Sequence, residues 1–267
     1  MEKLVKEGVP LSLSGKVALI TGGSRGIGAA AVKLFRQAGA RVFFNYRSAE
    51  EQALLLAEEC GGRDLCQCTQ QNLASPADGA ALVRSAQQAF GRLDCLVVNH
   101  GVWPAHDAPI HSMSDTQWRS TLATNLDSTF GLVRAAVAEM QQQAPIAGVR
   151  GHIVLVASTA AQRGEAFHAD YAASKGALVS LTKSLSSELA GDGIYCNCVA
   201  PGWVDTEMSA AALTDPETSK KVLATIPLGR VARPEEIAGP ILFLCSPLAG
   251  FTSGEIFNVN GGAVLVG

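Results

Sequence analysis

The fold is decided by one stretch of the chain, residues 17–28, which read VALITGGSRGIG. Its first part, 17–21, is a short apolar run that predicts a strand, and a helical pattern begins at Gly26. Gly22, Gly26 and Gly28 permit a tight turn in which backbone N–H groups and a helix N-terminus approach a phosphate closely. Their spacing differs from the usual G-x-G-x-x-G, so the glycines alone could form a simple connection. Their position between the first strand and a helix favours the pyrophosphate of a dinucleotide.

The rest of the chain repeats this order of strand and helix. Short apolar runs predict further strands at 41–46, 65–69, 94–98, 152–158 and 194–200, and helical patterns cover 26–38, 49–60, 76–90, 115–143 and 169–190. Strands that are nearly continuous apolar runs, alternating with helices, indicate a parallel sheet covered on both faces. We therefore expect an α/β protein with a doubly wound, Rossmann-like parallel sheet and helices on both faces.

Length and composition favour a single domain over residues 1–267. With 48% hydrophobic and 17% charged residues, the chain is ample for one large core and short for two ordinary domains. We expect residues 1–14 to form an N-terminal extension. Helical and loop signals from residue 201 onward break the alternation, and the segment 203–233 is a candidate substrate lid.

Charge and hydropathy exclude several classes of function. The formal net charge is −3 with both signs scattered along the chain, so there is no basic stripe for nucleic acid. Residues 1–16 hold no apolar run of signal-peptide length, and nothing later approaches the roughly 18 uninterrupted apolar residues of a membrane span. We expect a soluble, cytoplasmic protein that binds neither nucleic acid nor membrane.

The seven cysteines are an odd number, and their spacing fits neither a CxxC pair nor a set of zinc ligands. Cys66 and Cys68, like Cys196 and Cys198, lie two apart in predicted strands, so each pair shares one face of its strand. We interpret them as core thiols in a reducing compartment. The alternative is a disulfide or metal site built from these two pairs, but no histidines stand at ligand spacing.

Tyr171 and Lys175 lie four residues apart in a helical pattern, which places a phenol and an ammonium group on one helix face. A free tyrosine titrates near about 10, and a neighbouring cation stabilises the phenolate and lowers that pKa. Such a pair can exchange protons with an alcohol or a carbonyl. The alternative is an accidental pair on an ordinary helix, with a solvated lysine and a half-buried tyrosine.

The end of the second predicted strand bears on the choice of cofactor. An acid at this position would bond an adenosine ribose hydroxyl and repel a phosphate, but the residues here are Asn45, Tyr46, Arg47 and Ser48. Arg47, together with Arg25 in the glycine turn, could instead bind a 2′-phosphate through charge-assisted hydrogen bonds. This pattern predicts NADP(H) rather than NAD(H). Both arginines could also be solvated surface residues.

Taken together, these features resemble the short-chain dehydrogenases/reductases in their single-domain form. The resemblance covers nearly the whole chain. It rests on residues in family order: the turn 21–28, Asn99-His100-Gly101, Asn125, Ser158, Tyr171 with Lys175, and Pro201-Gly202.

The resemblance implies a role for each of four catalytic residues. Tyr171 is then the general acid that protonates the substrate oxygen as hydride arrives from the nicotinamide, and Lys175 lowers its pKa and bonds the nicotinamide ribose. Ser158 holds the carbonyl oxygen and stabilises its developing charge. Asn125 holds a water between itself and Lys175 for proton relay. As isolated residues, Ser158 and Asn125 could be structural, and the Asn125 amide could bond backbone and bend its helix.

The resemblance also implies a set of cofactor contacts, with two departures from the family pattern. His100 stands where the family has a small residue, either as a packed neutral imidazole or as part of an altered pocket. Asn72 stands where the family often has an aspartate beside adenine. The implied contacts, beside Tyr171 and Lys175, are Gly22, Ser24, Arg25, Gly26, Ile27, Gly28, Asn45, Tyr46, Arg47, Ser48, Asn72, Leu73, Asn99, Gly101, Pro201, Gly202, Val204 and Thr206.

Within the family, the chain is most similar to 3-oxoacyl-carrier-protein reductases. The segments 227–230 and 257–262 fit that group, and they also fit sugar and alcohol dehydrogenases. A carrier protein is acidic and would dock on a basic patch, yet 135–143 holds one acid and no base. A partly apolar substrate pocket is one interpretation of the large side chains that follow strand ends or lie in the candidate lid: Trp103, Pro104, Phe167, Trp203 and Met208. Any one of them could equally cover surface or pack between subunits.

Three functions remain open from the sequence. The first is an NADPH-dependent reductase of a small-molecule carbonyl or an acyl thioester, with 3-oxoacyl thioesters as leading substrates. The second is an NAD(P)-dependent sugar, polyol or alcohol dehydrogenase. The third is a non-catalytic sensor of the cofactor, which has no need of a proton donor beside a lysine. The resemblance further implies a homotetramer assembled through 115–143, 169–190 and the last strand.

Overall fold

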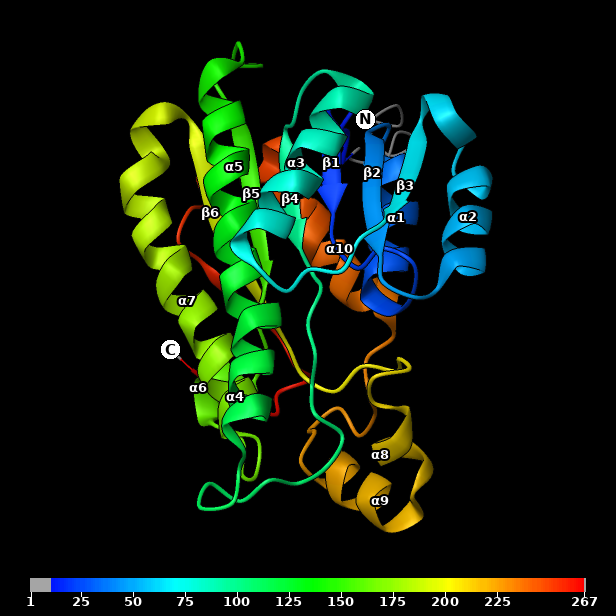
Figure 1. The fold of residues 1–267 in the computed structure, drawn as a ribbon, viewed down its shortest axis with the longest axis vertical. Coiled ribbons are helices and arrows are strands. Elements are labelled where there is room, and N and C mark those ends of the chain that lie inside the picture. The colour runs from blue at the N-terminus through cyan, green and yellow to red at the C-terminus, as the bar shows by residue number, and fades with distance from the viewer. Residues whose placement is uncertain (1–10, 267) are drawn as a thin grey trace, which may run out of the picture.

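Seven parallel strands form one sheet in the computed structural model, which describes residues 11–266 (Figure 1). The strand order is β3-β2-β1-β4-β5-β6-β7, so the chain winds outward in both directions from β1 and β4. This confirms the doubly wound fold. The strands are β1 (Val17–Ile20), β2 (Arg41–Tyr46), β3 (Cys66–Gln70), β4 (Cys95–Val98), β5 (Gly151–Val156), β6 (Ile194–Pro201) and β7 (Ile256–Val259).

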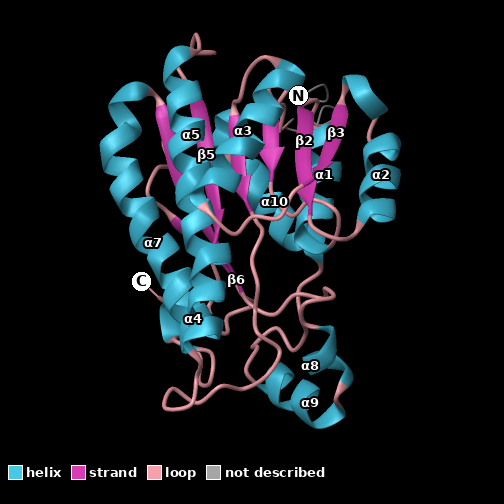
Figure 2. Ribbon diagram, in the orientation of Figure 1, coloured by secondary structure: helices cyan, strands magenta, loops and turns pink. Residues whose placement is uncertain are grey.

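Helices cover both faces of the sheet, as the apolar strands require (Figure 2). One face carries α1 (Gly26–Gln37), α2 (Glu50–Glu59) and α10 (Pro234–Leu244). The other carries α3 (Pro76–Phe90), α5 (Ser128–Gln142) and α7 (Ala169–Leu189). The remaining α-helices are α4 (Asp115–Leu122), α6 (Ala160–Arg163), α8 (Ala210–Thr214) and α9 (Pro216–Ala224).

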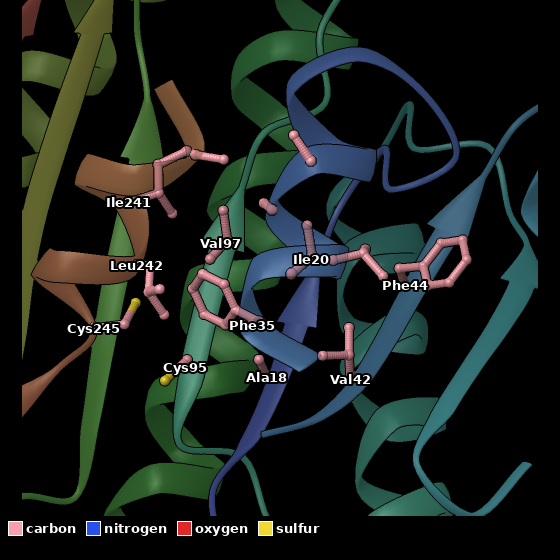
Figure 3. Packing of buried hydrophobic residues seen from close by; sticks show 14 of the residues in the cluster. Ala18, Ile20, Phe35, Val42, Phe44, Cys95, Val97, Ile241, Leu242 and Cys245 are labelled. Carbon is pink, nitrogen blue, oxygen red and sulfur yellow. The ribbon is translucent and has the colours of Figure 1, made fainter. Parts of the chain in front are cut away.

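The core is split in two by the sheet, because successive side chains of a strand point to opposite faces. In β1, Ala18 and Ile20 pack with the α1 and α10 cluster, whereas Val17 and Leu19 pack with α3, α5 and α7. Figure 3 shows the first cluster, with Phe35 of α1 between the strands and the α10 side chains. The four β1 residues and Phe35 are fully buried, so a packed core supports the strands on both faces and fixes the position of the loops at their carboxyl ends.

The predicted helix 115–143 is interrupted. Its middle, Ala123–Asp127, is a π-helix that joins α4 to α5. The chain is nevertheless helical throughout 115–142, close to the predicted 115–143, and a distortion is present at Asn125, which the sequence had left open as one possibility. The helices α6 and α10 and the strand β7 lie in segments for which no element was predicted.

The predicted N-terminal extension falls mostly outside the described residues, because the structure describes the chain from residue 11. Leu13 is fully buried and its N–H donates to the Ala38 carbonyl over 2.7 Å, so the end of the predicted extension belongs to the core. The candidate lid 203–233 contains α8 and α9, which lie beyond the carboxyl ends of the strands (Figure 1). Its closure over a substrate stays a prediction.

All seven cysteines lie within the described residues, and each is a free thiol. Five of them are buried, including the strand residues Cys66, Cys196 and Cys198. Burial raises the pKa of the Cys66 and Cys196 thiols to about 12, so these thiols are uncharged at neutral pH. They are core residues, as the sequence indicated. In residues 11–266 no helix combines the length and apolar character needed to cross a membrane.

Candidate active site

A cavity of about 580 Å³ follows the carboxyl edge of the sheet, where the glycine turn and the loops after β2, β4, β5 and β6 meet. It brings together every predicted site residue except Gly28 and Asn125. The predicted residues in its wall are Gly22, Ser24, Arg25, Gly26, Ile27, Asn45, Tyr46, Arg47, Ser48, Asn72, Leu73, Asn99, Gly101, Ser158, Tyr171, Lys175, Pro201, Gly202, Val204 and Thr206.

The glycine turn is shaped to receive an anion. Gly22 and Gly26 have φ angles of +64° and +52°, which disfavour any residue with a side chain. Gly28 lies behind the turn, where an added Cβ would stand 2.0 Å from the Gly22 carbonyl oxygen. Within the described residues no side chain caps α1 at Arg25, and its first turn holds no acid. The N–H groups of this helix end are thus left for a ligand, and they fit a dinucleotide pyrophosphate.

Asn45 holds the glycine turn in place. Its Oδ1 accepts a hydrogen bond from the Gly22 N–H over 3.0 Å, and its Nδ2 donates to the Gln71 carbonyl over 2.8 Å. The side chain is 3% exposed, and both of its polar atoms form hydrogen bonds within the protein. The structure thus gives Asn45 a structural task at the cavity, in addition to any contact with a cofactor.

The two arginines proposed for a 2′-phosphate differ in their surroundings. Arg25 forms an ion pair with Glu207 of the segment after β6, and both side chains are more than half exposed. Arg47 is exposed and forms no ion pair within the described part of the chain. Glu207 also lines the cavity, and the sequence interpretation did not include it. Of the two arginines, Arg25 would have to exchange its Glu207 partner for an anionic ligand, whereas Arg47 would not have to break an ion pair with a described residue.

Tyr171 and Ser158 meet at the inner end of the cavity. Tyr171 stands in the first turn of α7 and is 9% exposed, and Ser158 follows β5. Burial raises the pKa of Tyr171 to about 12, against a smaller lowering by its hydrogen bond with the Ser158 side chain. The negative charge of Glu165 raises this pKa further. The phenol is therefore protonated at neutral pH, which is the form that a general acid must have.

Lys175 lies one helical turn after Tyr171 and is 4% exposed. Its Nζ lies 5.9 Å from the centroid of the Tyr171 ring and donates to the Val156 carbonyl over 2.8 Å. Burial lowers the pKa of Lys175 to about 8. The expected lowering of the Tyr171 pKa is not found here, because desolvation of the phenol outweighs the influence of its neighbours.

Asn125 lies behind the cavity wall and is 1% exposed. Its amide is fixed by the loop after β4: Oδ1 accepts from the Val102 N–H over 2.8 Å, and Nδ2 donates to the Val102 carbonyl over 3.0 Å. A Cβ added to Gly101 would lie 3.2 Å from both Asn125 Oδ1 and Lys175 Nζ. These two atoms therefore face a common space that a side chain at residue 101 would fill. The proton relay between them stays a prediction.

His100 is a neutral imidazole, as one of the two sequence interpretations held. Loss of solvation, and secondly the charge of Lys175, lower the pKa of His100 to about 3. Both ring nitrogens have hydrogen-bonding partners: Nδ1 lies 2.8 Å from Thr21 Oγ1, and Nε2 lies 2.8 Å from Ser128 Oγ and 3.1 Å from the Thr124 carbonyl oxygen. His100 also lines the cavity, so the pocket wall differs here from that of the family pattern.

One part of the cavity wall is aromatic and polar. Trp103, Trp203 and Met208 line it as predicted, whereas Pro104 and Phe167 do not. The two tryptophan rings meet edge to face at 6.3 Å.

Two charged residues of the cavity wall, Arg163 and Glu165, were missed by the sequence interpretation. Trp103 donates its indole N–H to Glu165 Oε1 over 3.1 Å and stacks on His168 with ring centroids 4.7 Å apart. Arg163 and Glu165 follow Ser158 in a segment without periodicity or motif, so the sequence carried no signal for them.

Comparisons with known proteins agree on the family, whereas the activities named in their descriptions differ. A family model described as Enoyl-(Acyl carrier protein) reductase matches residues 22–264. The 3-oxoacyl-(acyl-carrier-protein) reductase FabG of Vibrio cholerae is 35% identical over 259 residues, which cover 96% of this chain and 100% of the relative.

Two solved structures are similar over nearly their whole length. A short-chain dehydrogenase/reductase from Brucella melitensis, described as a glucose/ribitol dehydrogenase, superposes with a TM-score of 0.87 at 33% identity and covers 97% of this chain and 100% of its own. A protein described as a 2-deoxy-d-gluconate 3-dehydrogenase from Agrobacterium tumefaciens, with bound NADP, has a TM-score of 0.84 at 32% identity and covers 96% and 99%.

Proposed function

The chain belongs to the short-chain dehydrogenase/reductase family of oxidoreductases, and from this premise we propose that it is an NADPH-dependent carbonyl reductase with 3-oxoacyl thioesters as leading substrates. The observation that carries the proposal is the protonated Tyr171 phenol beside Ser158 at the inner end of a cavity that begins at the glycine turn. The match to a 3-oxoacyl-carrier-protein reductase over 96% of the chain supports the choice of substrate.

In this proposal each residue of the site has a separate role in reduction. A bound reduced nicotinamide supplies the hydride. The Ser158 hydroxyl orients the substrate oxygen and donates a hydrogen bond to it as negative charge develops. Tyr171 donates its proton to the same oxygen, and the nearby ammonium of Lys175 stabilises the phenolate that results. Asn125 and Lys175 then return a proton through the space above Gly101.

Preference for NADP(H) rests on the charge around the end of β2. Asn45, Tyr46, Arg47 and Ser48 line the cavity at the end of β2, and none of these four carries a carboxylate that would repel a 2′-phosphate. Arg47 is free to bind that phosphate, and a similar structure holds NADP. We expect Arg47→Ala to weaken NADPH binding by about ten-fold, the size of one charge-assisted hydrogen bond, and to leave NADH binding unchanged. Equal turnover with both cofactors in the unaltered protein would contradict the proposal.

A second candidate function is a sugar, polyol or alcohol dehydrogenase. It is favoured by the polar and aromatic substrate end, where Arg163 and Glu165 accompany Trp103 and Trp203. Aromatic faces with charged groups suit a hydroxylated substrate as well as a thioester. Both described structures similar to this chain are sugar or sugar-acid dehydrogenases by description. A cofactor sensor is the least supported function, because it has no use for a protonated phenol at the cavity's inner end.

The test compares substrates of the two candidate classes. NADPH consumption is followed with an acetoacetyl thioester, a diketone and, in the oxidative direction with NADP⁺, glucose. Preference for the thioester supports the first function, and preference for glucose supports the second. Cofactor binding without turnover on any substrate would indicate a sensor.

Replacement of the general acid tests the mechanism itself. We expect Tyr171→Phe to reduce turnover by at least about a thousand-fold, because the proton donor is lost, while cofactor affinity stays within about two-fold. Fluorescence titration measures the affinity, with Trp103 and Trp203 in the cavity wall as reporters. Retained turnover would remove Tyr171 from the role of acid.

We also propose a homotetramer in the cytoplasm. Trp118 of α4 and Phe130 of α5 are 37% and 48% exposed on the segments expected to form a subunit interface. The free thiols are consistent with a reducing compartment. Sedimentation at micromolar concentration measures the oligomeric state, and a monomer would contradict the first part of this proposal.

A further inference from the structure

The side chain of His100 forms a hydrogen-bonded bridge between two parts of the site that are far apart in the sequence, with Thr21 at one end and the Thr124 carbonyl at the other. The Thr124 carbonyl oxygen can only accept a hydrogen bond, so His100 Nε2 carries the proton and Nδ1 is the acceptor. Nδ1 therefore accepts from the Thr21 hydroxyl, whose oxygen in turn accepts from the N–H groups of Asn99 and His100 over 2.9 and 3.1 Å. A neutral Nε2–H tautomer satisfies every one of these contacts.

One end of the bridge is the base of the glycine turn. Thr21 is fully buried and immediately precedes Gly22. Gly22 packs directly on the His100 backbone, since a Cβ added to it would lie 3.3 Å from His100 Cα. The Asn99 side chain donates to the Thr21 and Gly22 carbonyls over 3.1 and 3.3 Å. The orientation of the turn therefore depends on contacts with residues 99 and 100.

The other end of the bridge is the π-helix. In an α-helix the Ser128 N–H would donate to the Thr124 carbonyl, but here it donates to the Ala123 carbonyl, one residue further back. The Thr124 carbonyl thus loses its helical donor. His100 Nε2 and Ser128 Oγ, the latter at 2.7 Å, donate to it instead. His100 supplies a donor that the π-helix requires, and Asn125 stands within this π-helix.

We propose that His100 is a positioning residue that fixes the glycine turn and the Asn125 π-helix relative to each other, so that one side chain aligns cofactor binding with proton relay. The inference rests on the proposed function, because it takes the turn to hold the cofactor and Asn125 to serve the relay. It concerns this chain in particular, since a small residue at position 100 could make neither contact.

Two substitutions separate the ends of the bridge. In His100→Asn, the amide oxygen replaces Nδ1 as acceptor for Thr21, and the donor to the π-helix is lost. In His100→Gln, the longer amide replaces Nε2 as donor, and the acceptor for Thr21 is lost. The dissociation constant for NADPH is measured by tryptophan fluorescence, and the effect on the proton relay is measured as steady-state kcat at saturating cofactor and substrate, because Tyr171 must be reprotonated in every cycle.

We expect opposite patterns from the two variants. His100→Asn should keep the dissociation constant within about two-fold and lower kcat by about ten-fold, the effect of one unmade hydrogen bond on the relay. His100→Gln should weaken NADPH binding by about ten-fold and keep kcat at saturating cofactor within about two-fold. Ser128→Ala, which removes only one partner on the π-helix side, should follow His100→Asn in a smaller degree. It serves as the second test if a His100 variant does not fold.

The matched control is His152→Ala, which removes another neutral histidine, 3% exposed on β5 and absent from the cavity wall. It should lower the melting temperature and leave both site measurements unchanged. Equal effects of His100→Asn and His100→Gln on both measurements, or a pattern matched by His152→Ala, would overturn the inference. An unaltered protein that binds NADPH but reduces no carbonyl would defeat the proposed function, and the binding measurement would still decide the Thr21 end of the bridge.

Discussion

Replacing Lys175 with methionine should stabilise the folded protein near neutral pH while it abolishes turnover. The side chain is 4% exposed, and burial lowers its pKa from 10.5 to about 8. A lysine whose pKa is lower in the folded state binds its proton more tightly in the unfolded chain, so the buried ammonium opposes folding. A fall of about 2.5 pKa units corresponds to about 3 kcal/mol at pH values below the folded pKa.

Part of the stabilisation expected for Lys175→Met is offset by the loss of a hydrogen bond. Lys175 Nζ donates to the Val156 carbonyl over 2.8 Å, and a methionine leaves that oxygen without this donor. An unpaired buried carbonyl costs about 1–2 kcal/mol, whereas the similar volume of methionine leaves no large void. The net stabilisation expected for Lys175→Met near pH 7 is therefore about 1–2 kcal/mol.

The pH dependence of this difference identifies its cause. Between the folded pKa of about 8 and the unfolded value of 10.5, the unfolded chain keeps a proton that the folded chain has lost. Wild-type stability therefore rises with pH across this window, and the variant lacks that rise. The advantage of Lys175→Met should shrink by about 2 kcal/mol between about pH 8 and pH 9.5 and then change sign.

Urea unfolding followed by circular dichroism measures these free energies at about pH 7 and pH 9.5. Lys183→Met is the control, because Lys183 is exposed on the same helix, and its substitution should change stability by less than about 0.5 kcal/mol at either pH. A Lys175→Met variant that is less stable than wild type at pH 7, or a difference independent of pH, would refute the reasoning.

Two further predictions concern the glycine turn. Gly28→Ala should weaken NADPH binding by at least about a hundred-fold, about 3 kcal/mol, because the new Cβ would stand 2.0 Å from the Gly22 carbonyl oxygen. The control is Gly239→Ala, which should leave the fluorescence titration with NADPH unchanged, because nothing lies within 4 Å of an added Cβ there. Unaffected NADPH binding in both variants would contradict the assignment of the turn to the cofactor. Glu207→Gln should tighten NADPH binding about two- to five-fold by releasing Arg25, with no change for NADH and a smaller gain in high salt. An equal gain for both cofactors would argue against Arg25 at the 2′-phosphate.

The sequence predicted most of the sheet because its strands are buried on both faces. In β1, β4 and β5 every residue is buried, which produces the continuous apolar runs that were recognised. The edge strand β7 was missed because it is only partly buried and carries Asn258, so its pattern does not differ from that of a loop. The sheet edge where the cavity lies also followed from the sequence, because the carboxyl ends of parallel strands must lie together.

The details of the site depended on contacts that no local pattern encodes. A distortion at Asn125 was one of the possibilities that the sequence left open. That the π-helix frees the Thr124 carbonyl, and that the His100 imidazole donates to this carbonyl, became visible only with the fold in hand. Arg163, the last residue of the short helix α6, and Glu165, in the loop that follows, reach the cavity because of the path that the chain takes after β5. The pKa of Tyr171 could not be inferred from its spacing to Lys175, because desolvation by surrounding residues decides its direction.

The Tyr171 and Lys175 values change how the pair is understood. The pKa of the Tyr171 phenol is about 12 and that of the Lys175 ammonium is about 8, so the lysine loses its proton first as pH rises. The order is the reverse in water, where a free lysine amine is a stronger base than a tyrosine phenolate. Loss of that proton removes the cation available to stabilise a phenolate, so it disfavours the step in which Tyr171 gives up its own. The ammonium of Lys175 therefore sets the upper pH limit for proton donation by Tyr171.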